Sequence, residues 1–85
     1  MEFVRTERFK KDFKKLDRTA QDRVLAALDK YAANTQHPSL QAKKMEGTDD
    51  IWEMRASDNL RVTCQPGKNQ ITLRRVGTHD ILGRP

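Results

Sequence analysis

Apolar and polar residues alternate over the first positions of the chain and then change to a helical period. Residues 2–5 are short and roughly alternating, which is typical of a β-strand. Thr6 is a suitable N-cap, and Glu7 would stand in the favourable first turn of a helix. A first helix with one apolar stripe is predicted, because apolar side chains recur at i, i+4 and i+7: Phe9, Phe13 and Leu16.

A second helix is predicted after a very short turn. Its cap is Asp17 or Thr19, and these residues form its apolar side: Val24, Leu25, Leu28, Tyr31 and Ala32. Residues 34–38 end it, because the proline there disfavours helical geometry at His37, to which we assign no role. So short a link predicts an antiparallel helical hairpin. Residues 35–50 show little periodicity and are expected to form a long connection, which in a compact domain is often functional.

The next part of the chain follows the two-residue period of β-strands. Residues 51–56 and 60–64 alternate apolar with polar side chains, and residues 57–59 form a three-residue turn between them. A slip by one residue would mix the two faces, so one register is strongly preferred. That register pairs these residues on the core side: Trp52 with Cys64, Met54 with Val62, and Ala56 with Leu60.

A second turn at residues 66–69 leads to a last strand. Ile71 and Leu73 supply its core face, and Gly77 ends it. The order of elements predicts an α+β fold made of an N-terminal strand, an antiparallel helical hairpin and a three-stranded antiparallel meander. Residues 1–85 are expected to form a single domain.

The composition limits the kinds of function that the chain can have. With 85 residues, of which 35% are hydrophobic and 34% charged, the core must be thin, so we expect no deep cofactor pocket and no cofactor. The net charge of +5 favours an acidic partner, such as nucleic acid, an anionic membrane or an acidic protein segment. No apolar run approaches the roughly 20 residues that span a bilayer. The single cysteine, Cys64, gives neither an internal disulfide nor a zinc framework. We therefore expect a cytoplasmic, metal-free domain with no membrane partner.

Arginines dominate the polar face of the predicted meander. The register sets Arg55 directly across from Arg61, where like charges are destabilising unless an anion relieves them. Continuing the meander sets Arg74 near Arg61 on the same face. Guanidinium groups suit phosphate, and His79 just beyond the strand could transfer a proton, since a histidine has an ordinary pKa of about 6.5. The pattern indicates a pocket for a phosphodiester; exposed arginines that only keep a basic protein soluble are the alternative.

Lysines extend this positive charge. Lys43 and Lys44 stand in the long connection and could add charge to the pocket, or simply be solvated. The first helix carries four more, which suit an RNA backbone or an acidic protein partner, or form a solvated face: Lys10, Lys11, Lys14 and Lys15.

Three motifs resemble those of a known family. They are Lys-Lys-Met-Glu-Gly at residues 43–47, the Trp-Glu-Met-Arg…Asn-Leu-Arg-Val hairpin at 52–62, and Leu-Arg-Arg-Val-Gly-Thr-His-Asp-Ile-Leu at 73–82. With them the chain resembles, over nearly its whole length, the RelE/ParE superfamily of bacterial toxins from type II toxin–antitoxin systems, especially RelE- and YafQ-like mRNA interferases. The resemblance implies a RelE-like fold and a metal-independent endoribonuclease that cuts ribosome-bound mRNA by 2′-hydroxyl attack on the adjacent phosphate. It also implies a cognate antitoxin that neutralises this inhibition of translation.

The resemblance assigns roles by position. Arg61 matches the arginine that contacts the scissile phosphate in RelE-like enzymes, Arg75 the catalytic arginine before Gly-Thr-His, and His79 that motif's histidine. Arg55 stands where YafQ-like proteins have a histidine and RelE-like proteins a lysine. Strand alternation favours Arg74 in the site, whereas the motif favours Arg75, and a bulge near the strand end would reconcile the two.

The chain also departs from the family. Gly83 follows Leu82 where YafQ-like toxins have an aromatic that would stack on a base, and the C-terminal tyrosine of RelE-like toxins has no counterpart. Lys43 matches another YafQ-type histidine only loosely. Two alternatives stay open: a ParE-like inhibitor of DNA gyrase without catalysis, against which His79 argues, and an RNA-binding module whose catalysis has decayed.

Overall fold

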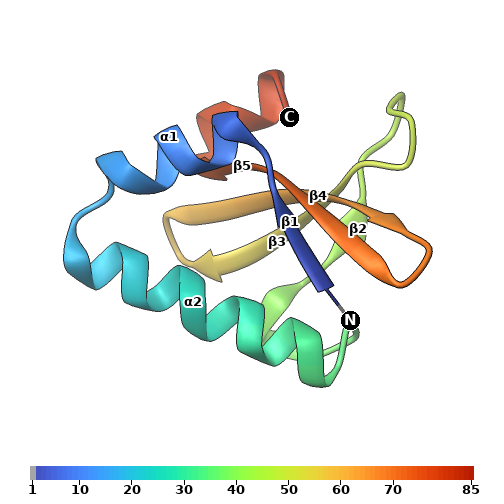
Figure 1. The fold of residues 1–85 in the computed structure, drawn as a ribbon, viewed down its shortest axis with the longest axis horizontal. Helices are drawn as coiled ribbons and strands as arrows, with labels where there is room; N and C mark the ends of the chain where they lie inside the picture. Colours follow the sequence, from blue (N-terminus) through green and yellow to red (C-terminus); the bar gives the residue numbers. More distant parts are fainter. Residues whose placement is uncertain (1) are drawn as a thin grey trace.

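The fold places two helices before most of the strands, and a computed structural model describes it for residues 2–85 (Figure 1). Its elements are β1 (Glu2–Arg5), α1 (Glu7–Lys15), α2 (Arg18–Ala33), the 3₁₀ turn η1 (Pro38–Leu40), β2 (Lys43–Lys44), β3 (Trp52–Ser57), β4 (Leu60–Gly67), β5 (Gln70–Gly77) and the 3₁₀ turn η2 (His79–Gly83). The predicted helices and strands are all present. The long connection predicted over residues 35–50 also contains η1 and β2, which its sequence pattern does not indicate.

The strands form one five-stranded sheet in the order β1-β5-β4-β3-β2. β3, β4 and β5 are antiparallel neighbours, as the predicted meander requires. β1 runs parallel to β5, with Phe3 opposite Ile71, so the sheet is mixed. The prediction of three meander strands is therefore incomplete, because it gave the first strand no partner and missed β2 beside β3. This pairing brings residues 2–5 beside residues 70–73, which are distant in sequence.

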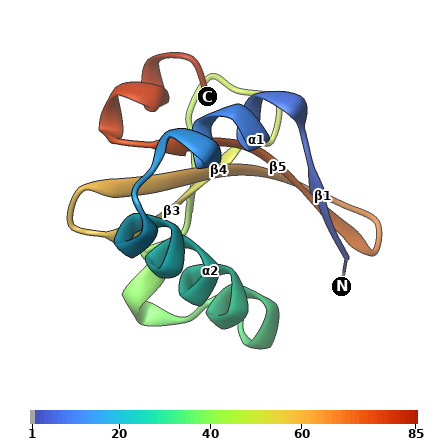
Figure 2. The same cartoon turned by 60° about the vertical axis from the view of Figure 1, so that its left-hand side comes forward.

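Side-chain caps begin both helices. The Thr6 hydroxyl accepts a hydrogen bond from the Phe9 amide at 3.1 Å, as predicted. The Asp17 carboxylate accepts from the Ala20 amide at 2.8 Å, so Asp17 and not Thr19 caps α2. The two helices run in opposite directions and are joined by a short link (Figures 1 and 2). α1 packs chiefly against β5, and α2 against β3 and β4.

The core lies between the helices and the sheet. Its buried members are Phe9, Val24, Ala27, Leu28, Tyr31, Leu40, Met54, Leu60, Val62, Cys64, Ile71, Leu73 and Val76. Two positions predicted for the apolar side of α2 are wrong, since Leu25 is 44% exposed and Ala32 is also exposed. The buried side of α2 instead includes Ala27, together with the correctly predicted Val24, Leu28 and Tyr31. Within residues 2–85, no helix has both the length and the apolar character needed to cross a membrane.

A bulge in β3 changes the predicted register of the first hairpin. Leu60 pairs with Ser57 instead of Ala56, so the predicted Ala56–Leu60 pair and the three-residue turn are wrong. The extra residue in β3 increases the local twist and leaves a tight turn at residues 58–59. The other predicted pairs are present: Trp52 with Cys64, Met54 with Val62, and Arg55 with Arg61.

A second bulge lies near the end of β5. Arg74 is the extra residue there, so β5 changes faces at this point. Arg61 lies opposite Gly77, and the prediction that Arg74 lies near Arg61 is therefore wrong. A bulge of the kind that would reconcile strand alternation with the terminal motif is present. The pairs on either side of it are Thr63 with Arg75 and Cys64 with Leu73.

Candidate functional site

The predicted histidine and one predicted arginine share a shallow depression of about 410 Å³, which we call the His79 depression. It lies beside the β3–β4 turn. Because Gly77 ends β5 opposite Arg61, the chain enters η2 next to Arg61, and this brings His79 into the same depression. The lining residues are Asp58, Asn59, Arg61, Thr78, His79 and Asp80.

Arg61 is held by the turn that it borders. Its Nη1 donates hydrogen bonds to three backbone carbonyls, those of Ser57 at 2.9 Å, Leu60 at 3.0 Å and Asp58 at 3.2 Å. These bonds fix the guanidinium in place. Its Nε and Nη2 groups donate to no other residue in the described chain, so they can bind an anion in the depression.

Arg55 is paired by the protein itself. It lies directly opposite Arg61, yet its Nη2 forms an ion pair with the Asp58 carboxylate. Its Nη1 donates to the Gln41 side-chain oxygen at 3.4 Å. An internal carboxylate therefore relieves the repulsion for which an external anion was expected. Arg55 does not line the His79 depression but the neighbouring groove between α2 and β3.

η2 carries His79 at its first residue. The His79 side chain is 80% exposed, and its Nε2 lies 3.7 Å from the Asp80 carboxylate. Thr78 caps this turn, since its hydroxyl accepts from the Asp80 amide at 3.3 Å. η2 approaches β5 so closely that a Cβ on Gly77 would lie 2.9 Å from a methyl carbon of Ile81. A glycine at 77 is what lets η2 pack here and hold His79 beside Arg61.

Arg75 lies outside the His79 depression and is bound to α1. Its Nε donates to Asp12 Oδ2 at 2.8 Å and its Nη2 to Asp12 Oδ1 at 3.0 Å. The same Oδ2 accepts from the Val76 backbone amide at 3.2 Å. We call this arrangement the Asp12–Arg75 clamp; its two side chains are only 10% and 17% exposed.

Ionisation of both partners is favoured within the clamp. Burial alone would raise the pKa of the Asp12 carboxyl, but the hydrogen bonds from Arg75 and the Val76 amide, with the nearby positive charges, outweigh it and lower that pKa. The hydrogen bond from Asp12 in turn raises the pKa of Arg75. Arg75 is therefore a charge that the fold already neutralises.

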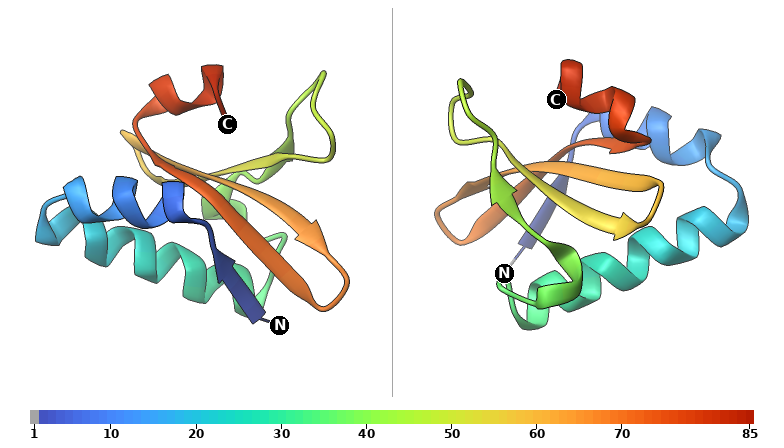
Figure 3. Two further views of the ribbon diagram at one scale, coloured as in Figure 1. Left: turned by 45° about the horizontal axis from the view of Figure 1, so that its top comes forward. Right: turned by 180° about the vertical axis from the view of Figure 1, so that it is seen from behind.

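A second depression, of about 440 Å³, is lined by Arg74 and Arg75, the other two arginines predicted for the site. We call it the arginine depression. Arg74 donates to the Pro85 carbonyl at 3.2 Å and to the Gln65 side chain at 3.2 Å. η2 starts at the His79 depression, and Arg84 and Pro85, which follow η2, line the arginine depression. Figure 3 shows the end of the chain, which supplies Arg84 and Pro85 to this lining, beyond the end of β5 and apart from α2. The lining residues are Thr6, Arg8, Ile51, Arg74, Arg75, Arg84 and Pro85.

The predicted lysines line neither depression. Lys43 lies in β2 with its Nζ 4.0 Å from the Glu53 carboxylate, and Lys44 borders a separate hollow beside residues 45–48. The lysines of α1 are all exposed: Lys10, Lys11, Lys14 and Lys15. Within residues 2–85, only Lys10 among them has an ion-pair partner, which is the Glu7 carboxylate. In that same range, no group of three or more His, Cys, Asp or Glu side chains is arranged to hold a metal ion.

Sequence reasoning missed the acidic half of the clamp. Asp12 stands three residues after Phe9 and beside Phe13, which places it at the edge of the buried stripe of α1. A carboxylate between two pairs of lysines at such a position indicates a partner across the core edge. Arg8 and Arg84 gave no such signal, because only the packing of α1 and of the chain after η2 around β5 brings them together.

A family model described as "ParE toxin of type II toxin-antitoxin system, parDE" matches residues 3–82. Among curated proteins, no relative matches the sequence. The RelB–RelE antitoxin–toxin complex from Methanococcus jannaschii matches with a TM-score of 0.76 at 20% identity, covering 94% of each chain. The YoeB/ParE toxin from Agrobacterium tumefaciens matches with a TM-score of 0.78 at 13% identity, covering 93% of this chain and 99% of that one. The E. coli DinJ–YafQ complex matches with 0.68 at 16% identity, covering 95% and 96%. At these identities the likeness is one of fold.

Proposed function

This chain belongs to the ParE toxin family of type II toxin–antitoxin systems, within the RelE/ParE superfamily, and we propose that it acts by cutting mRNA on the ribosome. One observation carries the proposal: Arg61, with unoccupied guanidinium N–H groups, shares a depression with the exposed His79. An anion-binding fork beside a proton-transfer group is what phosphodiester cleavage by an internal nucleophile requires.

The proposed reaction uses the substrate's own nucleophile. The 2′-hydroxyl of one nucleotide attacks its 3′ phosphorus and gives its proton to His79 as general base. A bond from O2′ to phosphorus forms, the bond from phosphorus to O5′ breaks, and O5′ leaves with a proton from water. The products are a 2′,3′-cyclic phosphate and a 5′-hydroxyl. Arg61 stabilises the charge that builds on the phosphate oxygens, and its three turn carbonyls keep it in position.

Arg75 has a different role in this proposal. The terminal motif assigns it to catalysis, but it would have to leave Asp12 to reach a phosphate at His79. We assign it a positioning role, in which the clamp fixes the end of β5 and hence the start of η2. Arg55 contributes charge beside the depression while paired to Asp58. A depression this shallow makes few contacts with RNA, so the ribosome must present the strand.

Primer extension on mRNA-programmed ribosomes tests the proposal. Wild type should produce cuts that are absent from free mRNA, and Arg61→Ala and His79→Ala should abolish them. Arg18→Ala, in an exposed ion pair with Asp22, provides a matched control for Arg61→Ala that should cut like wild type. Absence of cuts by the wild type on ribosomes would refute the proposal.

A second candidate function is inhibition of DNA gyrase without catalysis. The match to a family model that bears the ParE name favours it. In that case purified protein would block gyrase supercoiling, and His79→Ala would block it equally well. A decayed RNA-binding module would neither cut nor inhibit gyrase, and its RNA binding would survive the same substitution.

We also propose a cognate antitoxin as partner. One of the structures that share this fold, the RelB–RelE structure from Methanococcus jannaschii, is an antitoxin–toxin complex. A hollow between α1 and α2 is lined by Phe9, Phe13, Leu25 and Leu28 with cationic Arg5 and Lys10 beside them, which suits an amphipathic acidic segment. An acidic segment that covers the arginine depression is the alternative docking mode. Leu25→Glu should abolish co-purification with the neighbouring gene's product if the hollow is used, and Arg84→Glu should do so if the arginine depression is used.

A further inference from the structure

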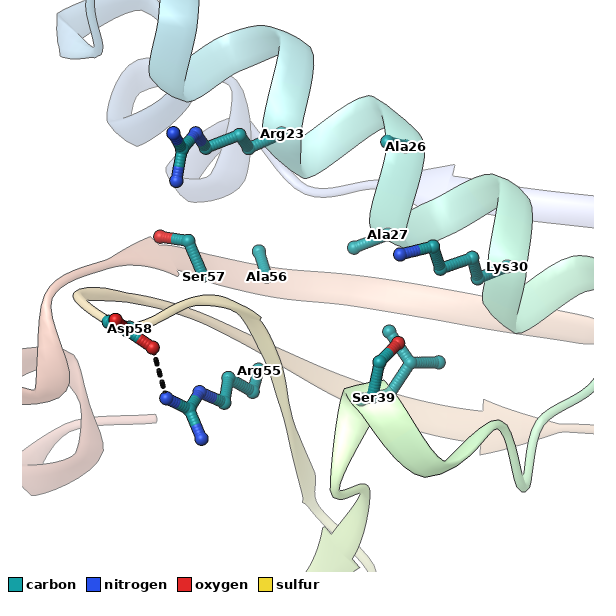
Figure 4. Close-up of a pocket in the computed structure, with 10 residues that line it drawn as sticks. Arg23, Ala26, Ala27, Lys30, Ser39, Arg55, Ala56, Ser57 and Asp58 are labelled. Carbon is teal, nitrogen blue, oxygen red and sulfur yellow. Dashed lines mark hydrogen bonds and ion pairs between the residues drawn. The ribbon is translucent and has the colours of Figure 1, made fainter.

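A groove of about 360 Å³ separates α2 from β3, and we call it the α2–β3 groove (Figure 4). α2 forms one wall, the end of β3 forms the other, and η1 closes one end. The side chains that carry charge or hydroxyl groups into its lining are Arg23, Lys30, Ser39, Arg55, Ser57 and Asp58.

Small side chains keep this groove open. Ala26 and Ala27 of α2 and Ala56 of β3 line it where longer side chains would fill it. β2 pairs only with the first two residues of β3, so the outer edge of β3 beyond Glu53 has no strand beside it among residues 2–85. The groove therefore runs along an uncovered sheet edge.

Two cations in the groove have no counter-charge. Arg23 and Lys30 stand at i and i+7 of α2, about 10.5 Å apart along the helix axis, and both extend over the groove (Figure 4). Neither makes an ion pair or a side-chain hydrogen bond with any residue from 2 to 85. Arg55 is the exception, since it pairs with Asp58. The groove thus presents two uncompensated positive charges.

The lining suits a phosphate backbone better than a protein segment. Stable protein contacts usually need large apolar or aromatic anchors in pockets. The large apolar side chain here, Leu40, is only 1% exposed. Phosphate oxygens need only cations and small hydrogen-bond donors, and Arg23, Lys30 and the Ser57 hydroxyl supply these.

The groove is also continuous with the candidate catalytic site, because Asp58 lines both it and the His79 depression. We infer that single-stranded RNA leaving the His79 depression crosses the β3–β4 turn and lies in the α2–β3 groove, where Arg23 and Lys30 neutralise two further phosphates. This inference rests on the proposed function for the identity of the strand. The groove is a binding region beyond the predicted site, and Arg55 is the one predicted site residue that lines it.

Binding of a fluorescent, non-cleavable 2′-O-methyl RNA tests the inference without chemistry. Arg23→Ala/Lys30→Ala should weaken binding about 10-fold at low salt and reduce the slope of log affinity against log salt by about 1.4, at about 0.7 per phosphate contact. Arg18→Ala/Lys68→Ala removes the same charge from exposed positions outside the groove and should leave both quantities near wild type. Thermal unfolding of each variant shows that the protein is folded.

The outcomes separate the groove from the proposed function. Equal binding by the two double variants, or no binding by the wild type, overturns the groove as an RNA site. Polyglutamate that binds more tightly than RNA and depends on Arg23 and Lys30 also overturns it, and identifies an acidic protein as the occupant. Cuts on ribosomes by the same proteins test the proposed function independently, so either idea can fail alone.

Discussion

Arg75 and Asp12 bind each other through two parallel hydrogen bonds of 2.8 and 3.0 Å, and this joins the end of β5 to the middle of α1. The same carboxylate accepts from the Val76 amide, on a stretch of β5 beyond its pairing with β1. The clamp thus satisfies a strand edge that would otherwise be open. In our proposal it also positions the end of β5 and hence the start of η2.

Breaking the clamp from either side should destabilise the protein. Arg75→Ala leaves a largely buried carboxylate unpaired, which should lower the free energy of unfolding by about 2–3 kcal/mol. Breaking a fully buried pair costs more, about 3–5 kcal/mol. Urea unfolding measures this loss. Arg75→Ala/Asp12→Ala should recover part of it. If Arg75 acts only through catalysis, Arg75→Ala would unfold at the wild-type urea concentration while losing activity.

The clamp should also make stability depend on acid. Because the folded state lowers the pKa of Asp12 below its ordinary value of 3.8, the clamp contributes fully above about pH 4. That contribution is lost as the pH falls through the lowered pKa and the carboxylate takes up a proton. The difference in unfolding free energy between wild type and Asp12→Asn should therefore be constant from pH 7 to about 5 and shrink below about 4. A difference unchanged down to pH 2 would contradict this.

Adding one methyl group at residue 77 should displace His79. In Gly77→Ala the new Cβ would lie 2.9 Å from Ile81, so η2 must move, at a stability cost of about 1–3 kcal/mol. The rate of cleavage on ribosomes should fall by more than the loss of folded protein accounts for. Gly83→Ala is the control, because nothing lies within 4 Å of a Cβ there. Equal activity in the two variants would show that η2 does not position His79.

Cys64 should be chemically inert in the folded protein. It is fully buried, and burial raises its pKa from 9.0 to about 11. At pH 8 iodoacetamide should modify it only as fast as the protein unfolds, and readily in urea. The neutral thiol also supports the fold below about pH 9, a contribution that is lost as the pH rises through about 11. Rapid modification of native protein would mean that the core opens locally.

Removing the charge of Asp58 should strengthen RNA binding. Asp58→Asn frees Arg55 from its ion pair and leaves Arg55 and Arg61 facing each other without a carboxylate. The affinity for 2′-O-methyl RNA should rise, and the salt slope should grow by about 0.7 for one added phosphate contact. Stability should fall modestly, because no carboxylate then relieves the repulsion between the two arginines. Weaker binding would mean that Asp58 positions Arg55 for the RNA.

Local patterns predicted most of this fold, and the errors came from one distant strand pairing and from irregular local pairings. The caps at Thr6 and Asp17 and the pairing of Arg55 with Arg61 depend on residues close in sequence. The parallel pairing of β1 with β5 does not, because its two strands meet only in three dimensions. The two-residue β2 and the bulge at Ala56 lie close in sequence to the residues they pair with, but the alternation of apolar and polar side chains does not mark them.

The candidate site divides in the same way. The sequence-based prediction that Arg61 and His79 lie close together is confirmed, since one hairpin and one strand end determine their positions. It also grouped Arg75 with them, because the motif shows which residues follow one another and not which carboxylate each one meets. The acid that binds Arg75 comes from a helix 63 residues away.

The parallel pairing of β1 with β5 determines when the molecule can assemble. Residues 2–5 have no strand partner until residues 70–73 have been synthesised, and the Asp12–Arg75 clamp needs β5 as well. Contacts this distant in sequence slow folding, because the entropy of closing a long loop opposes them. A nascent chain that lacks β5 and η2 therefore has neither the complete sheet, nor the clamp, nor the His79 depression. The candidate site cannot form before residues 70–83 are available.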